Sequence, residues 1–271
     1  MTVPSILSDC DRSALWKTSC RIGGEETCCF VQSGRQLALR VGRRVRSSKF
    51  PKVDEDSVDD VGAWEYVALQ LMSRCGINAP SSRLMRIGGR SVLLMRRFDR
   101  EGDSRTPYLS GLTAVQGVDG GRYSYLELVE FLEAWGARPH ADLPELWLRA
   151  LFSCAIGNAD NHLRNYGFLR EGTGWALSPA FDVNPTPGDE AKYLNTGLDS
   201  DVREADPRVA LSMCEYFRLG APEAKRRALA MAEVLKGWRS VARSCGISEA
   251  SIERMRSSFE AGIARLRSAA R

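Results

Sequence analysis

The stretch Gly157-Asn158-Ala159-Asp160-Asn161-His162-Leu163-Arg164-Asn165 decides how this 271-residue chain is interpreted. It follows a very apolar segment, Leu146 to Ile156, and precedes a predicted strand. A polar loop held between two rigid elements is a common place for catalytic groups. Asp160, His162 and Asn165 offer a base, a donor and a neutral oxygen ligand close together in the chain.

A second acid follows the loop, in Ser178-Pro179-Ala180-Phe181-Asp182. The chain before it predicts a hairpin around Glu171-Gly172-Thr173-Gly174, because two apolar runs flank this turn sequence. A hairpin returns on itself, so we expect Asp182 to come back towards the loop that carries Asp160. Oxygens of Asp and Asn are suitable ligands for Mg²⁺. Each of these residues alone could simply cap a turn, but the ordered set favours a magnesium site.

Glu65 is a third candidate. A helix is predicted from Val61 to Cys75, with Gly76 as its C-terminal stop. Helical spacing places Glu65 in an apolar stripe, so a buried carboxylate would need a cation. Lys49, on the preceding predicted strand, could supply it. The pattern fits equally well a Glu65 at the edge of the stripe that reaches water.

The pattern along the chain predicts an α+β protein. Short strands are expected at 27–31, 36–41, 45–50, 84–87 and 91–96. Helices are expected at 123–135, 144–156 (with Pro144 in the first turn) and 222–244, followed by one capped by Ser248. A glycine-rich change of character after Arg100 suggests a small β-rich lobe at 1–100 and a mostly helical lobe at 101–271.

Composition excludes several classes of protein. The 38 basic and 34 acidic residues give a charge of +4, too mild to indicate direct nucleic-acid binding. No apolar run approaches the length of a membrane span, and the N-terminus does not resemble a secretory signal, so we expect a cytoplasmic protein without a membrane partner. The 8 cysteines form no C-x-x-C pair, and the presence of only 2 histidines excludes most multi-histidine metal sites.

The loop resembles a known kinase family. Asp160 to Asn165 has the D-x-x-x-x-N spacing of the protein-kinase catalytic loop, and GNADNHLRN is similar to the loop of HipA-like kinases. Ser178 to Asp182 resembles the second metal-binding segment of that family. Lys49-Phe50-Pro51, Trp64-Glu65-Tyr66 and Met95 to Arg100 resemble further HipA segments in the same order. The resemblance implies a two-lobed, protein-kinase-like fold.

The resemblance also implies residue roles. Asp160 would orient or deprotonate the attacking hydroxyl, and His162 would approach the transferred phosphoryl group. Asn165 and Asp182 would hold Mg²⁺ between the phosphates of ATP. Contacts to the nucleotide would come from Lys49 paired with Glu65, from a phosphate-covering loop containing Gly23, Gly24 and Thr27, and from the backbone near Arg96, Arg97 and Phe98. Taken by itself, the Gly23 to Thr27 segment is better explained as a plain turn.

The function that the resemblance implies is an ATP- and Mg²⁺-dependent serine/threonine kinase. HipA-like kinases include toxins that phosphorylate a translation protein, often an aminoacyl-tRNA synthetase, and that an antitoxin protein restrains. The chain is more similar to the short, HipT-type members, which lack an N-terminal subdomain of the longer HipA proteins. The residues leave two alternatives: a kinase with a lipid or small-molecule acceptor, and a nucleotide-binding pseudokinase that acts as a binding partner.

Overall fold

The computed structural model describes residues 15–22, 25–32, 35–40, 60–87, 90–101, 104–188 and 190–271. The chain forms two compact units, Met1–Tyr66 with Pro80–Thr106 and Val67–Ala79 with Pro107–Arg271. The predicted strand at 45–50, together with Lys49, Gly23 and Gly24, lies outside the described residues. The division into domains at residue 100 stays a prediction.

The first unit contains an antiparallel five-stranded sheet in the order β1-β2-β3-β5-β4. Its strands are β1 (Leu15–Ile22), β2 (Glu25–Gln32), β3 (Arg35–Arg40), β4 (Ser82–Ile87) and β5 (Arg90–Arg96). Strand β5 lies between β3 and β4, and its apolar run Val92, Leu93 and Leu94 is buried, as expected for a central strand. The short strands β6 (Arg100–Glu101) and β7 (Ser104–Arg105) pair with each other. The sequence predicted these elements except for β1, β6 and β7.

Helix α2 (Val61–Arg74) confirms the predicted helix. It begins after Asp60, whose carbonyl oxygen accepts hydrogen bonds from the amides of Ala63 and Trp64 at 2.9 Å each. It ends at Gly76, whose φ of 78° is a left-handed conformation that glycine adopts without steric cost. Residues of α2 up to Tyr66 belong to the first unit, and those from Val67 belong to the second.

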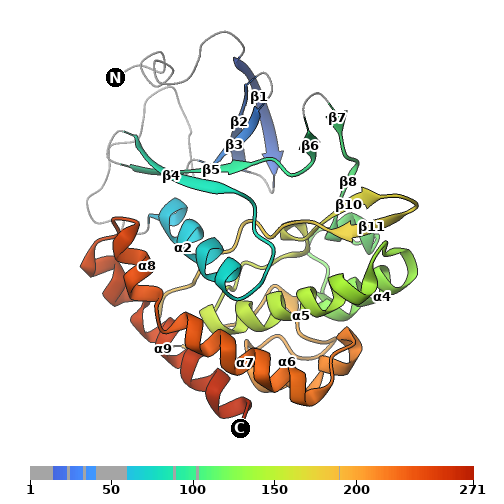
Figure 1. The fold of residues 1–271 in the computed structure, drawn as a ribbon, viewed down its shortest axis with the longest axis vertical. Coiled ribbons are helices and arrows are strands. Elements are labelled where there is room, and N and C mark those ends of the chain that lie inside the picture. Colours follow the sequence, from blue (N-terminus) through green and yellow to red (C-terminus); the bar gives the residue numbers. More distant parts are fainter. Residues whose placement is uncertain are drawn as a thin grey trace. The chain divides into compact units, whose positions relative to one another are not determined.

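The second unit is mostly helical (Figure 1). Its helices are α3 (Gly111–Ala114), α4 (Tyr125–Trp135), α5 (Pro139–Ile156), α6 (Pro207–Ser212), α7 (Ala221–Leu235), α8 (Trp238–Ser244) and α9 (Glu249–Ala269), with 3₁₀ turns η2 (Leu163–Asn165) and η3 (Cys214–Phe217). A small sheet has the order β11-β10-β8, formed by β8 (Tyr108–Ser110), β10 (Gly167–Glu171) and β11 (Gly174–Leu177). Strands β10 and β11 are the hairpin that the sequence predicted. Strands β9 (Tyr123–Ser124) and β12 (Thr196–Gly197) pair in parallel.

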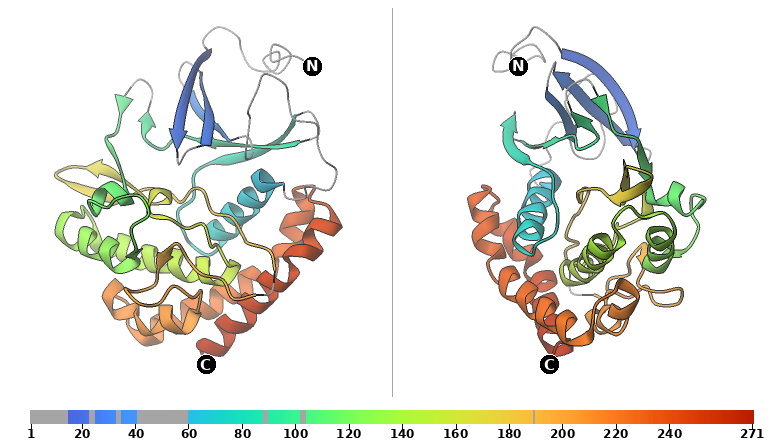
Figure 2. Two further views of the ribbon diagram at one scale, coloured as in Figure 1. Left: turned by 180° about the vertical axis from the view of Figure 1, so that it is seen from behind. Right: turned by 45° about the vertical axis from the view of Figure 1, so that its right-hand side comes forward.

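Helix α5 forms the core of the second unit, because every residue from Leu146 to Ile156 is buried. Helix α9 packs against both α5 and α7 (Figure 2). The prediction that Pro144 opens this helix was wrong. Pro139 occupies the first turn, and Pro144 lies inside the helix. Because proline lacks an N–H, a helix that continues through it loses one backbone hydrogen bond there.

The prediction of one helix over 222–244 was also wrong, because the chain breaks at Lys236 and Gly237 into α7 and α8. The break places the Trp238 ring on Phe259 of α9, with ring centroids 4.5 Å apart and nearly parallel planes. The predicted Ser248 cap is confirmed, since its side chain accepts a hydrogen bond from the amide of Ser251 at 3.2 Å.

Two further findings concern the described part of the chain. No helix there combines the length and apolarity needed to cross a bilayer. Cys75, Cys154, Cys214 and Cys245 are free thiols.

We expect Gly262→Ala to destabilise the protein. A Cβ at Gly262 in α9 would overlap the carbonyl oxygen of Ala155 in α5, so the helices would have to separate. The gain in helix propensity is about 1 kcal/mol, whereas overpacking a tight contact costs typically 1–3 kcal/mol or more. Chemical denaturation should therefore show a lower free energy of unfolding. Gly237→Ala is the control, because its Cβ would make only an ordinary contact, 3.4 Å from the Val234 carbonyl oxygen. Equal effects of the two substitutions would contradict the close-packing argument.

Candidate active site

The polar loop begins where α5 ends. Gly157 has a φ of 63° and caps the helix in the left-handed conformation, with its amide bonded to the carbonyl oxygen of Ser153. The side chain of Lys192 lies against this glycine, with its Cγ 3.0 Å from where a Cβ would stand. The loop then runs from Asn158 into η2 and leads to β10. The direction of the loop is therefore fixed by the buried helix before it and the strand after it.

Asp160 is exposed at the tip of this loop. Its carboxylate Oδ1 accepts a hydrogen bond from Asn195 Nδ2 at 3.3 Å, and its carbonyl oxygen accepts one from Asn165 Nδ2 at 2.9 Å. Its orientation is therefore set partly by the segment that precedes β12. An exposed carboxylate on a fixed backbone is suited to receive a proton from an incoming group.

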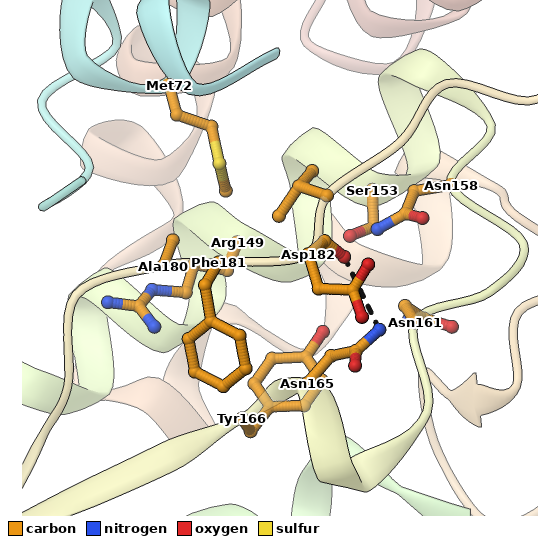
Figure 3. Close-up of a pocket in the computed structure, with 11 residues that line it drawn as sticks. Met72, Arg149, Ser153, Asn158, Asn161, Asn165, Tyr166, Ala180, Phe181 and Asp182 are labelled. Carbon is orange, nitrogen blue, oxygen red and sulfur yellow. Dashed lines mark hydrogen bonds between the residues drawn. The ribbon is translucent and has the colours of Figure 1, made fainter. Parts of the chain in front are cut away.

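Asn165 brings Asp160 and Asp182 together. Its Nδ2 donates to the carbonyl oxygen of Asp182 at 3.3 Å (Figure 3), as well as to that of Asp160. Its Oδ1 is buried and makes no hydrogen bond to any described residue. Asp182 has a φ of 57°, an uncommon conformation for a residue other than glycine. Both residues line one pocket in the second unit.

The donor atoms of this pocket fit a hard cation. Described residues that line it include Asp182, which supplies a carboxylate, and Asn158 and Asn165, whose buried amide oxygens have no hydrogen-bond partner among the described residues. No cluster of three or more His, Cys, Asp or Glu side chains in the described ranges could hold a metal. A soft-metal site of zinc type is therefore not present there, whereas Mg²⁺ binds through few carboxylates and keeps several waters. The buried, unbonded Oδ1 of Asn165 is where a cation ligand is expected.

Asn161 is a site residue that the sequence analysis missed. It is 1% exposed. Its Oδ1 accepts from the Thr196 amide at 3.2 Å, and its carbonyl oxygen accepts from Thr196 Oγ1 at 2.6 Å. Its Nδ2 donates to the Tyr125 hydroxyl at 3.1 Å. Asn161 therefore ties the polar loop to β12 and α4. Asn161 is visible in the sequence as part of the polar run. The sequence does not show that its side chain points inward.

Buried charges of α5 hold the segment that leads to Asp182. Arg149 is 3% exposed, pairs with Glu145, and donates from Nη2 to the carbonyl oxygen of Ser178 at 2.6 Å. The Ala180 amide donates to the carbonyl oxygen of Asn78 at 2.8 Å. The path of residues 178–182 is therefore fixed at two points before it reaches Asp182.

His162 lies between Asp160 and Asn165 in the polar loop. It is partly buried, and its carbonyl oxygen accepts from the Asn165 amide at 2.8 Å at the start of η2. Its Nδ1 is buried and makes no hydrogen bond within the described part of the chain. A role for His162 at a transferred group stays a prediction.

The candidate nucleotide-binding residues of the first unit are partly described. Glu65 is fully buried, so the alternative in which it reaches water at the edge of the stripe does not apply. Arg96, at the end of β5, donates its amide to the Ser81 carbonyl oxygen at 2.8 Å. Thr27 lies in β2 opposite Cys20. Lys49, Gly23 and Gly24 fall outside the described residues, so their roles stay predictions.

The turn after β5 is fixed by an ion pair. Arg97 donates from Nε and Nη2 to the two carboxylate oxygens of Asp99, at 2.8 Å and 2.5 Å. Burial acts to raise the pKa of Asp99, but the hydrogen bonds and charge of Arg97 outweigh it and leave this pKa below its ordinary value. The Arg97–Asp99 ion pair therefore stabilises the backbone of this turn, which also contains Phe98.

The fold and the site define a kinase-like α+β protein of HipA type. The chain belongs to the HipA-like C-terminal domain family, which matches residues 41–263. The putative kinase Y4mE of Sinorhizobium fredii (strain NBRC 101917 / NGR234) is 24% identical over 244 residues, covering 83% of this chain and 50% of that protein. A putative kinase of Haemophilus influenzae is 25% identical over 142 residues, covering 45% and 41%. The chain thus spans about half the length of the curated relatives that it matches.

Two solved structures share the fold. HipA of Shewanella oneidensis MR-1, from a toxin-antitoxin complex with HipB and operator DNA, has a TM-score of 0.63 and 16% identity, covering 96% of this chain and 66% of that chain. The proinflammatory kinase CtkA of Helicobacter pylori has a TM-score of 0.66 and 13% identity, covering 93% and 94%. At these identities the likeness concerns the fold alone.

We expect the buried carboxyl of Asp142 to make stability depend on pH. Asp142 of α5 accepts a hydrogen bond from the Leu177 amide of β11 at 2.9 Å, just before the segment that leads to Asp182. Burial raises its pKa, although the Leu177 amide and Arg138 act in the opposite direction. The folded state therefore favours the protonated form. This contribution is fully present below the unfolded pKa and is lost as the pH rises through the folded pKa.

The test compares wild type with Asp142→Asn, which keeps an acceptor for Leu177 and removes the charge. The free energy of unfolding of the variant relative to wild type should increase from about pH 3.9 upward until the folded pKa is passed. Asp142→Ala should be less stable than Asp142→Asn by about 1–3 kcal/mol at any pH, because the Leu177 amide loses its partner. A constant difference between wild type and Asp142→Asn across this pH range would contradict the raised pKa.

Proposed function

We propose that this chain is an ATP- and Mg²⁺-dependent phosphotransferase, a serine/threonine protein kinase of the HipA type. The observation that carries the proposal is the arrangement around Asn165, whose amide nitrogen joins the backbones of Asp160 and Asp182 and whose buried oxygen has no hydrogen-bond partner among the described residues. One residue thereby connects a candidate base with a candidate metal ligand. Family membership supports the same assignment.

The candidate site residues of the two units would have the following roles. The exposed Asp160 carboxylate would orient the acceptor hydroxyl and receive its proton as the oxygen bonds to the γ-phosphorus of ATP and the bond to ADP breaks. Asn195 would hold that carboxylate in place. Asn165 and Asp182 would hold magnesium, which when bound supplies neutralisation of phosphate charge. His162 would lie near the transferred group. Lys49, Glu65, the Gly23 to Thr27 loop and Arg96 to Phe98 would contact the nucleotide.

The proposed biological role is that of a toxin kinase. The Shewanella HipA structure is a complex with HipB and operator DNA, which supports an antitoxin protein as a partner for this chain. The proposed acceptor is a protein of translation such as an aminoacyl-tRNA synthetase, and the proposed location is the cytoplasm. The resemblance of the loop and of the segment ending at Asp182 supports this role.

Asp160→Ala should abolish phosphate transfer without unfolding the protein. A positioned general base contributes typically 10²–10⁴-fold to rate, so we expect a loss of at least about 100-fold. The measurement is transfer from labelled ATP to proteins of a bacterial lysate, followed by identification of the labelled protein. Asp201→Ala is the matched control, because Asp201 is also an exposed aspartate and lies outside the proposed catalytic set.

The result also separates the alternatives. Wild-type activity in Asp160→Ala would overturn the assignment of the base. Label in lipid or small molecules instead of protein would replace the protein acceptor. Tight binding of Mg²⁺ and ATP without any transfer, to the chain itself or to the lysate, would indicate a pseudokinase.

A further inference from the structure

Asn184 follows Asp182 by two residues and is absent from the metal set that the family resemblance implies. It stands between two buried residues, Val183 and Pro185. The residue before a proline is sterically disfavoured in the helical region and favours extended backbone. The backbone at Asp182 is left-handed, with a φ of 57°, so the folded structure rather than a regular extended run brings the two side chains together.

The side chain of Asn184 contacts the Asp182 carboxylate directly. Its Nδ2 donates to Asp182 Oδ1 at 3.3 Å. Its own Oδ1 is buried and has no hydrogen-bond partner within the described residues, which is also the condition of Asn165 Oδ1. A buried acceptor left without a donor costs about 1–3 kcal/mol, and such a group calls for an explanation such as an ion or water. Two amides that contact Asp182 both carry such an oxygen.

The backbone that carries Asn184 is held on both sides. Before it, Arg149 binds the carbonyl oxygen of Ser178. After it, Thr186 Oγ1 accepts from the Ala159 amide at 3.3 Å, and Ser258 of α9 donates to the Thr186 carbonyl oxygen. Asn184 therefore sits on a positioned segment, which is what a ligand of a preorganised site requires.

We propose that Asn184 is the third side chain of the divalent-cation site, acting with Asn165 and Asp182. Asn184 would supply its buried amide oxygen as a hard ligand next to the Asp182 carboxylate, which its amide nitrogen contacts at 3.3 Å. A bound cation would satisfy this oxygen, which no described residue hydrogen-bonds.

The inference rests on the proposed function for the identity of the cation, which accompanies ATP. Its test uses the full chain and Mn²⁺ as the probe, with free Mn²⁺ measured by electron paramagnetic resonance, alone and with ADP. We expect Asn184→Ala to weaken Mn²⁺ binding about 10–100-fold, the range found when supporting groups of a metal site are removed. Asn184→Asp should restore binding, because it supplies an oxygen at the same place.

Asn78→Ala is the matched control. Asn78 is an exposed asparagine of the same unit, and its backbone, rather than its side chain, contacts Ala180. It should bind Mn²⁺ as wild type does, and all variants should stay folded, as shown by a cooperative thermal transition.

Several outcomes overturn the inference. They are wild-type affinity in a folded Asn184→Ala, weak binding in Asn184→Asp, and a wild type that binds no Mn²⁺ in either condition. Mn²⁺ binding that depends on Asn184 in a protein that transfers no phosphate would support the cation site and overturn only the kinase activity.

Discussion

The burial of α5 is the constraint on which the rest of the second unit depends. A helix buried along the whole of Leu146 to Ile156 must be covered on several sides, and α9 can cover it closely only because Gly262 has no side chain at the crossing. The few polar groups on this helix are then used to hold other chain segments. Asp142 binds the amide of Leu177, and Arg149 binds the carbonyl oxygen of Ser178. Buried polar groups must be paired. The hydrogen bonds that pair Asp142 and Arg149 therefore also fix the path of the chain from β11 to Asp182.

The site is unusual in relying on amides. Asn165 and Asn184 contact Asp182. Asn161 binds the polar loop to β12. An amide carries no net charge. The amides of Asn165 and Asn184 can therefore lie against Asp182 without the repulsion that a second carboxylate would cause, even when no cation is bound. The arrangement around Asp182 therefore does not itself require a metal. Its cost is the burial of amide oxygens without donors, a cost that a bound cation would remove.

The sequence predicted the local elements best where short-range chemistry determines them. The loop from Gly157 to Asn165, the hairpin after it, the end of α2 at Gly76 and the Ser248 cap depend on residues close together in the chain. Predictions failed where distant packing decides. The α7–α8 break places Trp238 on Phe259, and α5 continues through Pro144 because the core holds it. Asn161 and Asn184 were missed for the same reason: whether an asparagine points inward is a property of the tertiary structure.

The backbone at Asp182 links strain to the proposed chemistry. Its φ of 57° costs a residue with a Cβ on the order of 1–2 kcal/mol, a cost that glycine would avoid. Asp tolerates this conformation better than most residues, and the hydrogen bond from Asn165 to its carbonyl oxygen exists in this conformation. Glycine would relax the backbone but remove the carboxylate that the Asn184 amide contacts. A strained residue persists where the surrounding structure holds it. The hydrogen bonds from Asn165 and Asn184 meet this condition at Asp182, and its proposed role as a metal ligand would account for the choice of an acid over glycine.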